Sequence, residues 1–424
     1  MSVEIQELST RMPVPAEMLE YVKKFVPRYR QLGIRYFRDL PPARKEEMMR
    51  NIPHYVSEEF AEIRQRLSDL VQDREAAGEV SNNQFKPIPG VLVEQTTGTS
   101  GMPGRFPKTN AERTRLAMGI WKYRRKIDPG VSPDKFLPFV HLPFGQKEDP
   151  RIHGSDVVEI RAVYDEALRK QVRWLHAQPR MVCGHIKRFN EAGYPRMPGF
   201  IRVCETTSET LSPVEKQTVA DYFDCKLLNQ FGCIETWAFG YDETGTGEMD
   251  VLTDNVFLEL LNPETYEPIT RIGETGLLAL TSLHLRLLPI VRYLNGDRAE
   301  WTLAGERVKL RLHQDRQINM LLLNGKLVPG AEVVRVWLNI AFIRMGYLQM
   351  EFIQFVQTAE FEITVRIGAC AKGPKLWAEI QKVVAETATT TGAIHLVYEE
   401  VSAEGIAQEL KRKKYLFVSR LNPI

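Results

Sequence analysis

The chain has 424 residues, of which 43% are hydrophobic and 26% are charged, and its formal net charge is +2. This length is enough for two or three domains with large cores. The near-neutral charge argues against a nucleic-acid-binding protein, which usually carries a strong basic footprint. No run approaches the roughly eighteen apolar residues of a membrane span, and the N-terminus lacks a signal-peptide pattern. Five cysteines in so long a chain do not form a disulfide framework, so we expect a cytoplasmic protein.

The predicted elements begin with an amphipathic helical region over residues 1–75, which is interrupted by prolines. A short apolar run at 91–93 then leads into a loop crowded with threonine and glycine at 95–105. After this loop, Asn110 can cap a helix whose apolar residues recur at helical spacing. A loop of this composition between a strand and a helix is a candidate binding site.

A compact β-α-β unit is predicted next, with strands at 200–204 and 225–229. Between them, the segment 212–215 (Ser-Pro-Val-Glu) has the pattern of a capping box with proline at the first helical position. The handedness of such crossovers makes the two strands parallel, and ligands bind beyond the carboxyl ends of parallel strands. We therefore expect the loops at 205–211 and 230–236 to be neighbours over one site.

The C-terminal part of the chain has a different character. Residues 352–367 alternate in the manner of two hairpin strands, a helix is predicted over 374–388, and a further strand over 394–401. Two strands, a helix and a strand predict a small α+β module, which we interpret as a separate C-terminal domain.

The threonine-rich loop has residues suited to binding phosphate. Glycines let the backbone approach an anion closely, and the hydroxyl and amide groups donate hydrogen bonds to phosphate oxygens. The loop is not a Walker motif, because the Gly-Lys-Ser/Thr ending is absent. A plain flexible loop is the alternative interpretation. The predicted phosphate-binding residues are Thr96, Thr97, Gly98, Thr99, Ser100 and Gly101.

The same loop resembles the phosphate loop of the adenylate-forming superfamily, the acyl-CoA synthetases and adenylation domains. Residues 96–103 fit its pattern Ser/Thr-Ser/Thr-Gly-Thr-Thr/Ser-Gly-x-Pro. Three further segments occur in the family's order. Residues 206–211 (Thr-Thr-Ser-Glu-Thr-Leu) are similar to the adenine-side segment, and 231–235 (Phe-Gly-Cys-Ile-Glu) resemble Tyr-Gly-x-x-Glu. Residues 292–297 (Arg-Tyr-Leu-Asn-Gly-Asp) resemble Arg-Tyr-x-Thr-Gly-Asp.

The resemblance implies roles for individual residues. The ring of Phe231 would lie against adenine, Glu235 would hold magnesium and take part in catalysis, and Asp297 would bind the ribose hydroxyls. Each has a structural alternative when taken singly: a core aromatic residue, a salt-bridged glutamate and a turn aspartate. The remaining nucleotide-binding residues that the resemblance implies are Ser208, Glu209, Gly232 and Arg316.

The resemblance also implies the fold and the reaction. It implies an α/β fold, with a large N-terminal domain of mixed sheets flanked by helices over 1–316 and the small α+β domain over 317–424. A carboxylate would attack the α-phosphate of ATP and release pyrophosphate, and a thiol or amine would then take the acyl group. The expected cofactors are ATP and Mg²⁺, with coenzyme A as one candidate acceptor.

Length and the helical N-terminus look most like the phenylacetate-CoA ligase branch, which includes ligases of aryl acids and enzymes of antibiotic biosynthesis. We therefore expect a small aromatic acid as substrate, no nucleic-acid or membrane partner, and consider a homodimer. Two alternatives stay open: an amide-forming synthetase that does not use coenzyme A, and a non-catalytic homologue that binds an aryl acid or adenylate.

Several positions depart from the family pattern. Met102 stands where many relatives have a lysine, and Ile318 replaces the aspartate of the interdomain hinge. In the basic segment near the C-terminus, Lys413 is the candidate for the family's catalytic lysine, although a solvated basic tail explains that segment equally well. For the acyl pocket, the resemblance nominates Phe144 and Cys204.

Overall fold

The structure is a computed structural model that describes most residues of the chain. The chain divides into two compact units. The first unit comprises Met1–Gln95, Arg105–Asn295 and Glu300–Leu312, and the second comprises Thr96–Gly104, Gly296–Ala299 and His313–Ile424. The predicted domain boundary after residue 316 lies outside the described residues and stays a prediction. The described residues are 15–72, 84–96, 104–139, 149–153, 156–208, 213–305, 307–313, 320–323, 326–345, 352–391, 394–402, 404–405 and 417–421.

The first unit begins with a group of short helices, as the sequence predicted. Prolines mark their starts: Pro27 is the first residue of one helix and Pro53 the second residue of another, where the missing amide hydrogen costs no hydrogen bond. Apolar side chains such as Val22 and Met48 are fully buried. The helices are α2 (Ala16–Phe25), α3 (Pro27–Arg30), α4 (Lys45–Arg50), α5 (Ile52–Tyr55) and α6 (Ala61–Gln72).

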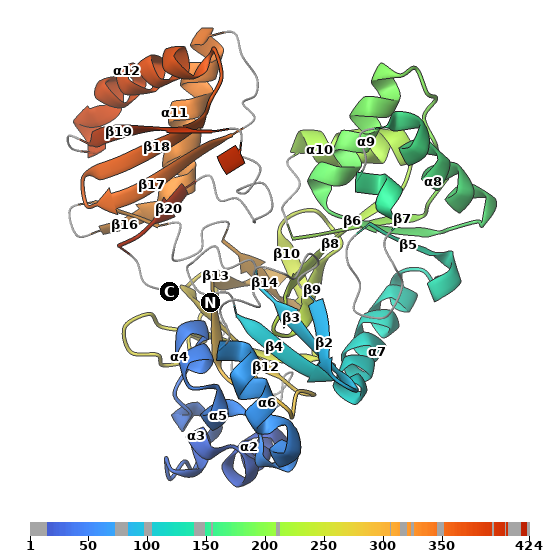
Figure 1. Cartoon of the computed structure of the whole chain (residues 1–424), viewed down its shortest axis with the longest axis vertical. Coiled ribbons are helices and arrows are strands. Elements are labelled where there is room, and N and C mark those ends of the chain that lie inside the picture. The colour runs from blue at the N-terminus through green and yellow to red at the C-terminus, as the bar shows by residue number, and fades with distance from the viewer. Residues whose placement is uncertain are drawn as a thin grey trace. The chain divides into compact units, whose positions relative to one another are not determined.

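An eleven-stranded mixed sheet forms the centre of this unit, with the order β11-β12-β13-β14-β10-β9-β8-β7-β6-β5 and the short β1 paired with β13 (Figure 1). Strands β5 to β8 are parallel, whereas β9 pairs antiparallel with both β8 and β10. This sheet and the helices around it confirm the predicted fold class. The strands are β1 (Ala43–Arg44), β5 (Phe136–Pro138), β6 (Trp174–Ala177), β7 (Val203–Thr207), β8 (Lys226–Cys233), β9 (Trp237–Asp242), β10 (Glu248–Val251), β11 (Val256–Leu261), β12 (Thr275–Ser282), β13 (Tyr293–Ala304) and β14 (Arg307–Leu312).

Helices cover both faces of the parallel strands. On one face, α8 (Val157–Arg169), α9 (Pro179–Glu191) and α10 (Pro213–Phe223) pack on an aromatic-rich core that includes Tyr164 and Cys204 (Figure 1). The neighbouring residue Glu205 bonds instead to Arg124 of α7 (Asn110–Ile127). Because successive strand residues point to opposite faces, α7 lies on the other face of the sheet.

The N-cap of α7 differs by one residue from the prediction. Thr109, not Asn110, is the cap: its hydroxyl accepts from the Glu112 amide, and the Glu112 carboxylate accepts from the Thr109 amide. Both residue types cap helices well, so the sequence could not separate them. The register decides, because Thr109 still pairs with Val91 in the sheet and therefore has the extended backbone that a cap needs.

The predicted β-α-β unit is confirmed as β7, α10 and β8, with parallel strands and a helix that begins at Pro213. The predicted capping-box residue Ser212 lies outside the described residues. The strand boundaries were wrong: β7 begins at Val203 rather than at residue 200, and β8 continues to Cys233, so residues 230–233 belong to a strand and not to the predicted loop. Residue Glu205 was predicted in the loop but lies inside β7, because buried donors satisfy its carboxylate.

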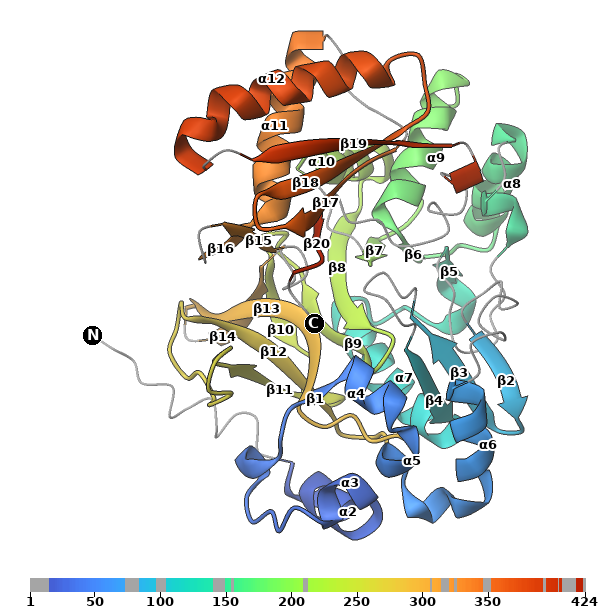
Figure 2. The same cartoon turned by 60° about the vertical axis from the view of Figure 1, so that its left-hand side comes forward.

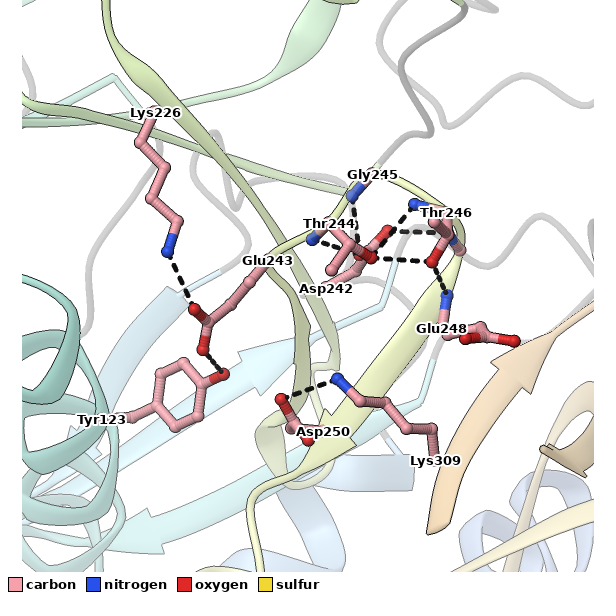
Figure 3. A network of polar contacts seen from close by, with 11 residues as sticks. Tyr123, Lys226, Asp242, Glu243, Thr244, Gly245, Thr246, Glu248, Asp250 and Lys309 are labelled. Atoms are coloured by element: carbon pink, nitrogen blue, oxygen red, sulfur yellow. Dashed lines mark hydrogen bonds and ion pairs between the residues drawn. The ribbon is translucent and has the colours of Figure 1, made fainter. Parts of the chain in front are cut away.

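A tight loop between β9 and β10 shows how the sheet turns at this point (Figure 3). The Asp242 carboxylate accepts hydrogen bonds from the amides of Thr244, Gly245 and Gly247, at 2.8 to 2.9 Å. Among the described residues, the donors to this carboxylate belong to the loop itself, which indicates a structural role in closing the hairpin.

A separate three-stranded sheet carries the threonine-rich loop. It consists of β2 (Gln84–Ile88), β3 (Val91–Gln95) and β4 (Arg105–Thr109), with β3 antiparallel to both neighbours. The threonine-rich segment lies between β3 and β4 in the chain, and the structure describes only its two ends, up to Thr96 and from Gly104.

The second unit contains a four-stranded sheet, β19-β18-β17-β20, and a two-stranded one, β15-β16. The predicted hairpin is confirmed as β17 and β18. Alternate residues Ile363, Val365 and Ile367 of β18 share a core with α11 and α12, so both helices pack on one face of the sheet (Figure 2). The elements are β15 (Met320–Leu323), β16 (Lys326–Pro329), α11 (Gly330–Met345), β17 (Ile353–Ala359), β18 (Glu362–Gly368), α12 (Gly373–Thr391), β19 (His395–Val401) and β20 (Phe417–Ser419).

Of the helices in the part of the chain that the structure describes, none has the length and apolar character needed to cross a membrane.

Candidate functional site

β7 and β8 are parallel neighbours, as the sequence predicted, but β8 continues three residues beyond the position that faces the end of β7. Thr207, the last residue of β7, pairs with Gln230 of the parallel strand β8. Ser208 follows directly with a φ of 72°, a left-handed conformation. Beyond Gln230, Phe231 is half-buried and Gly232 is exposed. Candidate adenine-binding residues of two motifs therefore come from adjacent strands.

Gly232 has a steric reason to be glycine. A Cβ atom at this position would lie 2.9 Å from the backbone oxygen of Trp237. The strand register shifts between Phe231 and Gly232, which is the kind of irregularity that a small residue permits. The close backbone approach fixes the path of the turn that leads to Glu235.

Glu235 is buried, with 6% of its surface exposed, and lies in the turn between β8 and β9. Its Oε1 accepts a hydrogen bond of 2.6 Å from the hydroxyl of Tyr293 on β13. Burial, together with the charge of Glu235, raises the pKa of Tyr293 well above its usual value, so the phenol stays protonated and donates. This bond joins two of the four segments that the sequence singled out.

A buried charge pair supports the same turn. Lys108 of β4 donates to Glu94 Oε2 of β3 at 2.6 Å and to the carbonyl oxygen of Ile234 at 2.7 Å. The indole nitrogen of Trp237 donates to the same Glu94 oxygen at 2.8 Å. The hairpin β3–β4 is thus bonded to both sides of the turn that carries Glu235.

Only the base of the predicted phosphate loop is described. The Thr96 amide donates to the Gly104 carbonyl at 2.8 Å, and the Gly104 amide donates to the Thr96 hydroxyl at 2.7 Å. Arg105, which starts β4, is buried and donates to the Gln95 side chain. Thr96 therefore closes the hairpin loop. The predicted phosphate-binding residues outside the described part are Thr97, Gly98, Thr99, Ser100 and Gly101.

The arginine of the Arg-Tyr segment has a structural role. Arg292 is buried, has a φ of 45°, and donates to Glu259 and to the backbone oxygens of Arg38 and Leu40. It ties the N-terminal segment to the sheet just before Tyr293. Its buried guanidinium thereby helps to fix the strand on which Tyr293 lies.

Asp297 also lies on β13, follows Gly296, which has a φ of 86°, and is half-buried. Cys204 has no exposed surface and packs within the aromatic-rich core, so its thiol lies inside that core rather than at a surface open to a substrate. The other predicted site residues lie outside the described residues: Phe144, Glu209, Arg316 and Lys413.

A second buried polar cluster surrounds Glu205, which lies on β7 two residues before the end of that strand. The Glu205 carboxylate accepts from Arg124 at 2.8 and 3.0 Å, from Trp174 at 2.6 Å and from Gln230 at 2.7 Å. Burial alone would raise the pKa of Glu205, but Arg124 and these donors outweigh burial and lower it. His176 is also buried, with Nε2 3.7 Å from Glu205 Oε1, and desolvation lowers its pKa to about 4.

Sequence reasoning missed the supporting residues Glu94 and Lys108. A weak signal was present, because Glu94 follows the apolar run 91–93 and precedes the loop. In the sheet, Glu94 faces Phe106 and Lys108 faces Leu92, so the two charged residues are diagonal neighbours. Only the strand register brings them together, and the register could not be derived from the sequence.

Comparisons with known proteins bear on the fold. No protein-family model and no curated protein matches this chain. Among solved structures, 2-hydroxyisobutyryl-CoA ligase in the postadenylation state with 2-HIB-AMP is similar at 14% identity and a TM-score of 0.59, covering 99% of this chain and 90% of the ligase. An open conformation of that ligase with 2-HIB-AMP and CoA gives 14% identity and 0.56, covering 98% and 92%.

Fatty acyl-adenylate ligases from E. coli and L. pneumophila are also similar, at 13% identity and a TM-score of 0.53, over 73% of this chain and 65% of the ligase chain. At these identities the likeness concerns the fold. The chain has the fold of adenylate-forming ligases, which confirms at that level the resemblance found in the sequence. The phenylacetate-CoA ligase branch stays a prediction.

Proposed function

We propose that this chain, which has the fold of adenylate-forming ligases, activates a small carboxylic acid as its acyl-adenylate. A carboxylate oxygen of the acid attacks the α-phosphorus of ATP. The bond from this phosphorus to the bridging oxygen breaks, and pyrophosphate leaves. A thiol or amine then attacks the acyl carbon, loses its proton and releases AMP. Both steps depend on positioning and on stabilising developing negative charge.

The observation that carries this proposal is the hydrogen bond between Tyr293 and Glu235. The two residues belong to different motif segments, 58 positions apart, and a chance resemblance would give no reason for them to meet. Their contact supports the interpretation that these two segments contribute to one nucleotide site.

The proposed roles follow from residue chemistry and position. Phe231 is half-buried and offers an aromatic face for adenine, and the resemblance assigns Ser208 and Glu209 to the same adenine-side role. Exposed Gly232 leaves room for the nucleotide. Asp297 would accept hydrogen bonds from the ribose hydroxyls, and Thr96 to Gly101 would orient the departing pyrophosphate.

The site fits magnesium through one carboxylate. Mg²⁺ is usually held by one or two carboxylates together with substrate phosphates. Glu235 Oε1 accepts the hydrogen bond from the Tyr293 hydroxyl, and a carboxylate oxygen of Glu235 is a ligand of the type that Mg²⁺ requires. When bound, magnesium would neutralise charge on the phosphates. Tyr293 would hold the carboxylate in the orientation needed for this contact.

Further roles are proposed for residues outside the described part. Lys413 would stabilise charge that builds up in the transition state, and Arg316 would contact ribose or phosphate. Phe144 is the remaining candidate for the acyl pocket. We propose an aromatic acid as the substrate and a specialised biosynthetic role in the cytoplasm, on the family resemblance alone.

For the acceptor, the structural relatives favour coenzyme A. The 2-hydroxyisobutyryl-CoA ligase structure holds both an acyl-adenylate and CoA, and this chain covers 92% of it. We therefore propose coenzyme A ahead of an amine.

The test incubates the purified chain with ATP, Mg²⁺ and single acids and follows AMP and acyl-adenylate by mass spectrometry. The proposal expects both products with at least one acid, and loss of free thiol when coenzyme A is added. Consumption of an added amine without loss of thiol would identify an amide-forming enzyme. AMP formation that ignores the acid would contradict the proposal.

A further inference from the structure

The side chain of Lys108 is fully buried, so its charge is not in contact with solvent. Its side chain is 0% exposed, and that of its partner Glu94 is 7% exposed. The ammonium group donates to Glu94 and to the backbone oxygen of Ile234, the residue before Glu235. A buried ion pair of this kind rarely adds stability over an apolar pair of similar size, because both charges lose their hydration. Its presence here calls for a reason other than stability.

The Glu94–Lys108 pair also contacts Trp237, a residue with an unusual backbone conformation. Trp237 has a φ of 63°, which costs energy for a bulky residue. Its indole donates to Glu94, and the Lys108 ammonium lies 5.9 Å from the centre of the ring. The two charges therefore hold both sides of Glu235: the carbonyl of Ile234 before it and the side chain of Trp237 after it.

The position of the pair in the chain relates it to the phosphate loop. Glu94 is the penultimate residue of β3, which enters the loop, and Lys108 lies on β4, which leaves it. The hairpin that carries the loop and the turn that carries Glu235 are thus bonded to each other through one lysine.

We propose that Glu94 and Lys108 are positioning residues for adenylation, which hold the Glu235 turn in a fixed place against the phosphate-loop hairpin. This inference rests on the proposed function. Small displacements of such groups are costly, since a shift of about 1 Å can lower a rate about 100-fold. The pair would therefore act on Mg·ATP through Glu235, without touching the nucleotide itself.

The experiment compares Lys108→Met, Lys108→Arg and the double variant Glu94→Gln/Lys108→Met. Unfolding in urea measures stability, calorimetry measures Mg·ATP binding, and pyrophosphate exchange measures adenylation. Lys108→Met leaves a buried carboxylate without its cation and should lower the urea midpoint. The double variant removes both charges, so it should regain much of the urea midpoint that Lys108→Met loses.

The proposal expects the double variant to stay impaired despite its recovered stability. Exchange should fall about 100-fold, and the Mg²⁺ concentration for half-maximal exchange should rise. Lys108→Arg should retain more exchange than Lys108→Met, because it restores the charge. If the double variant regains wild-type Mg·ATP binding and exchange together with its stability, the pair is only structural and the inference is wrong.

The matched control is Lys309→Met, which removes a lysine of the eleven-stranded sheet that pairs with Asp250 at 3.0 Å (Figure 3). It should leave Mg²⁺ dependence unchanged, and an equal shift in this control would also overturn the inference. Failure of the proposed function is distinguishable, since the wild-type chain itself would then not exchange pyrophosphate with any acid, whether or not it bound Mg·ATP.

Discussion

The hydroxyl of Tyr293 donates a 2.6 Å hydrogen bond to Glu235, and both side chains are buried. The raised pKa of Tyr293 means that the phenol cannot become an anion beside the carboxylate at neutral pH. The carboxylate is therefore held by a permanent donor. A charge that is fixed before the nucleotide arrives is a form of preorganisation, which lowers the cost of stabilising the transition state.

Replacing the Tyr293 donor should affect both the stability of the protein and the magnesium dependence of exchange. Tyr293→Phe removes one hydrogen bond to a charged group and should cost about 1.5–3 kcal/mol in the free energy of unfolding. Because the Glu235 carboxylate loses its orientation, the Mg²⁺ concentration for half-maximal exchange should also rise. Urea denaturation and magnesium titrations of pyrophosphate exchange measure the two effects.

Tyr123→Phe provides the control, because Tyr123 donates to Glu243 at 2.7 Å in the same unit (Figure 3). It should destabilise the protein by a comparable amount and leave the magnesium titration unchanged. An identical magnesium response in the two variants would show that Tyr293 has no special relation to the proposed metal site.

Asp297→Asn tests the proposed ribose contact. An amide can accept through only one of its two terminal atoms, so a bidentate contact with two hydroxyls is lost. A hydrogen bond to a charged group is worth about 1.5–3 kcal/mol. Its loss should therefore raise the KM for ATP roughly 10- to 100-fold. The KM for the acid should change little. Equal changes in both KM values would place Asp297 outside the nucleotide site.

Features that depend on interactions between residues close in the sequence could be predicted, whereas those that depend on contacts between distant residues could not. The β7-α10-β8 unit was predictable, because proline at the helix start and the apolar strands are local signals. The burial of Glu205 was not, since its partner Arg124 is 81 positions away and a lone glutamate in a strand is unfavourable. The Glu94–Lys108 pair depends on strand register in the same way.

The buried His176 predicts a pH dependence of stability. Its pKa is lowered from 6.5 to about 4, first by desolvation and also by the charge of Arg124, although Glu205 acts in the opposite direction. The unfolded chain therefore binds a proton below pH 6.5 that the folded chain does not accept until about pH 4. Stability from this group is complete above pH 6.5 and declines as the pH falls to about 4.

A difference of about 2.5 pH units corresponds to about 3 kcal/mol, so His176→Gln should flatten the decline by up to that amount. Urea denaturation of both proteins at a series of pH values between 4 and 7 measures it. Parallel curves for the wild type and the variant would contradict a neutral buried His176.

The candidate catalytic lysine can be separated from its basic neighbours by single substitutions. Lys413→Ala should lower pyrophosphate exchange about 100- to 1,000-fold, the usual cost of losing one group that stabilises transition-state charge. Lys411→Ala and Lys414→Ala should have small effects. If all three variants retain wild-type exchange, the segment is a solvated basic tail.

Carboxylate-dependent ATP–pyrophosphate exchange tests the central claim most directly. The panel contains benzoic, phenylacetic, anthranilic and heteroaromatic acids, with aliphatic hydroxy acids and no acid as comparisons. The account predicts Mg²⁺-dependent exchange with at least one aromatic acid, and its loss in Glu235→Gln. Exchange with no acid, by a protein that still binds ATP or an acyl-adenylate analogue, would contradict adenylation and identify a non-catalytic binding protein.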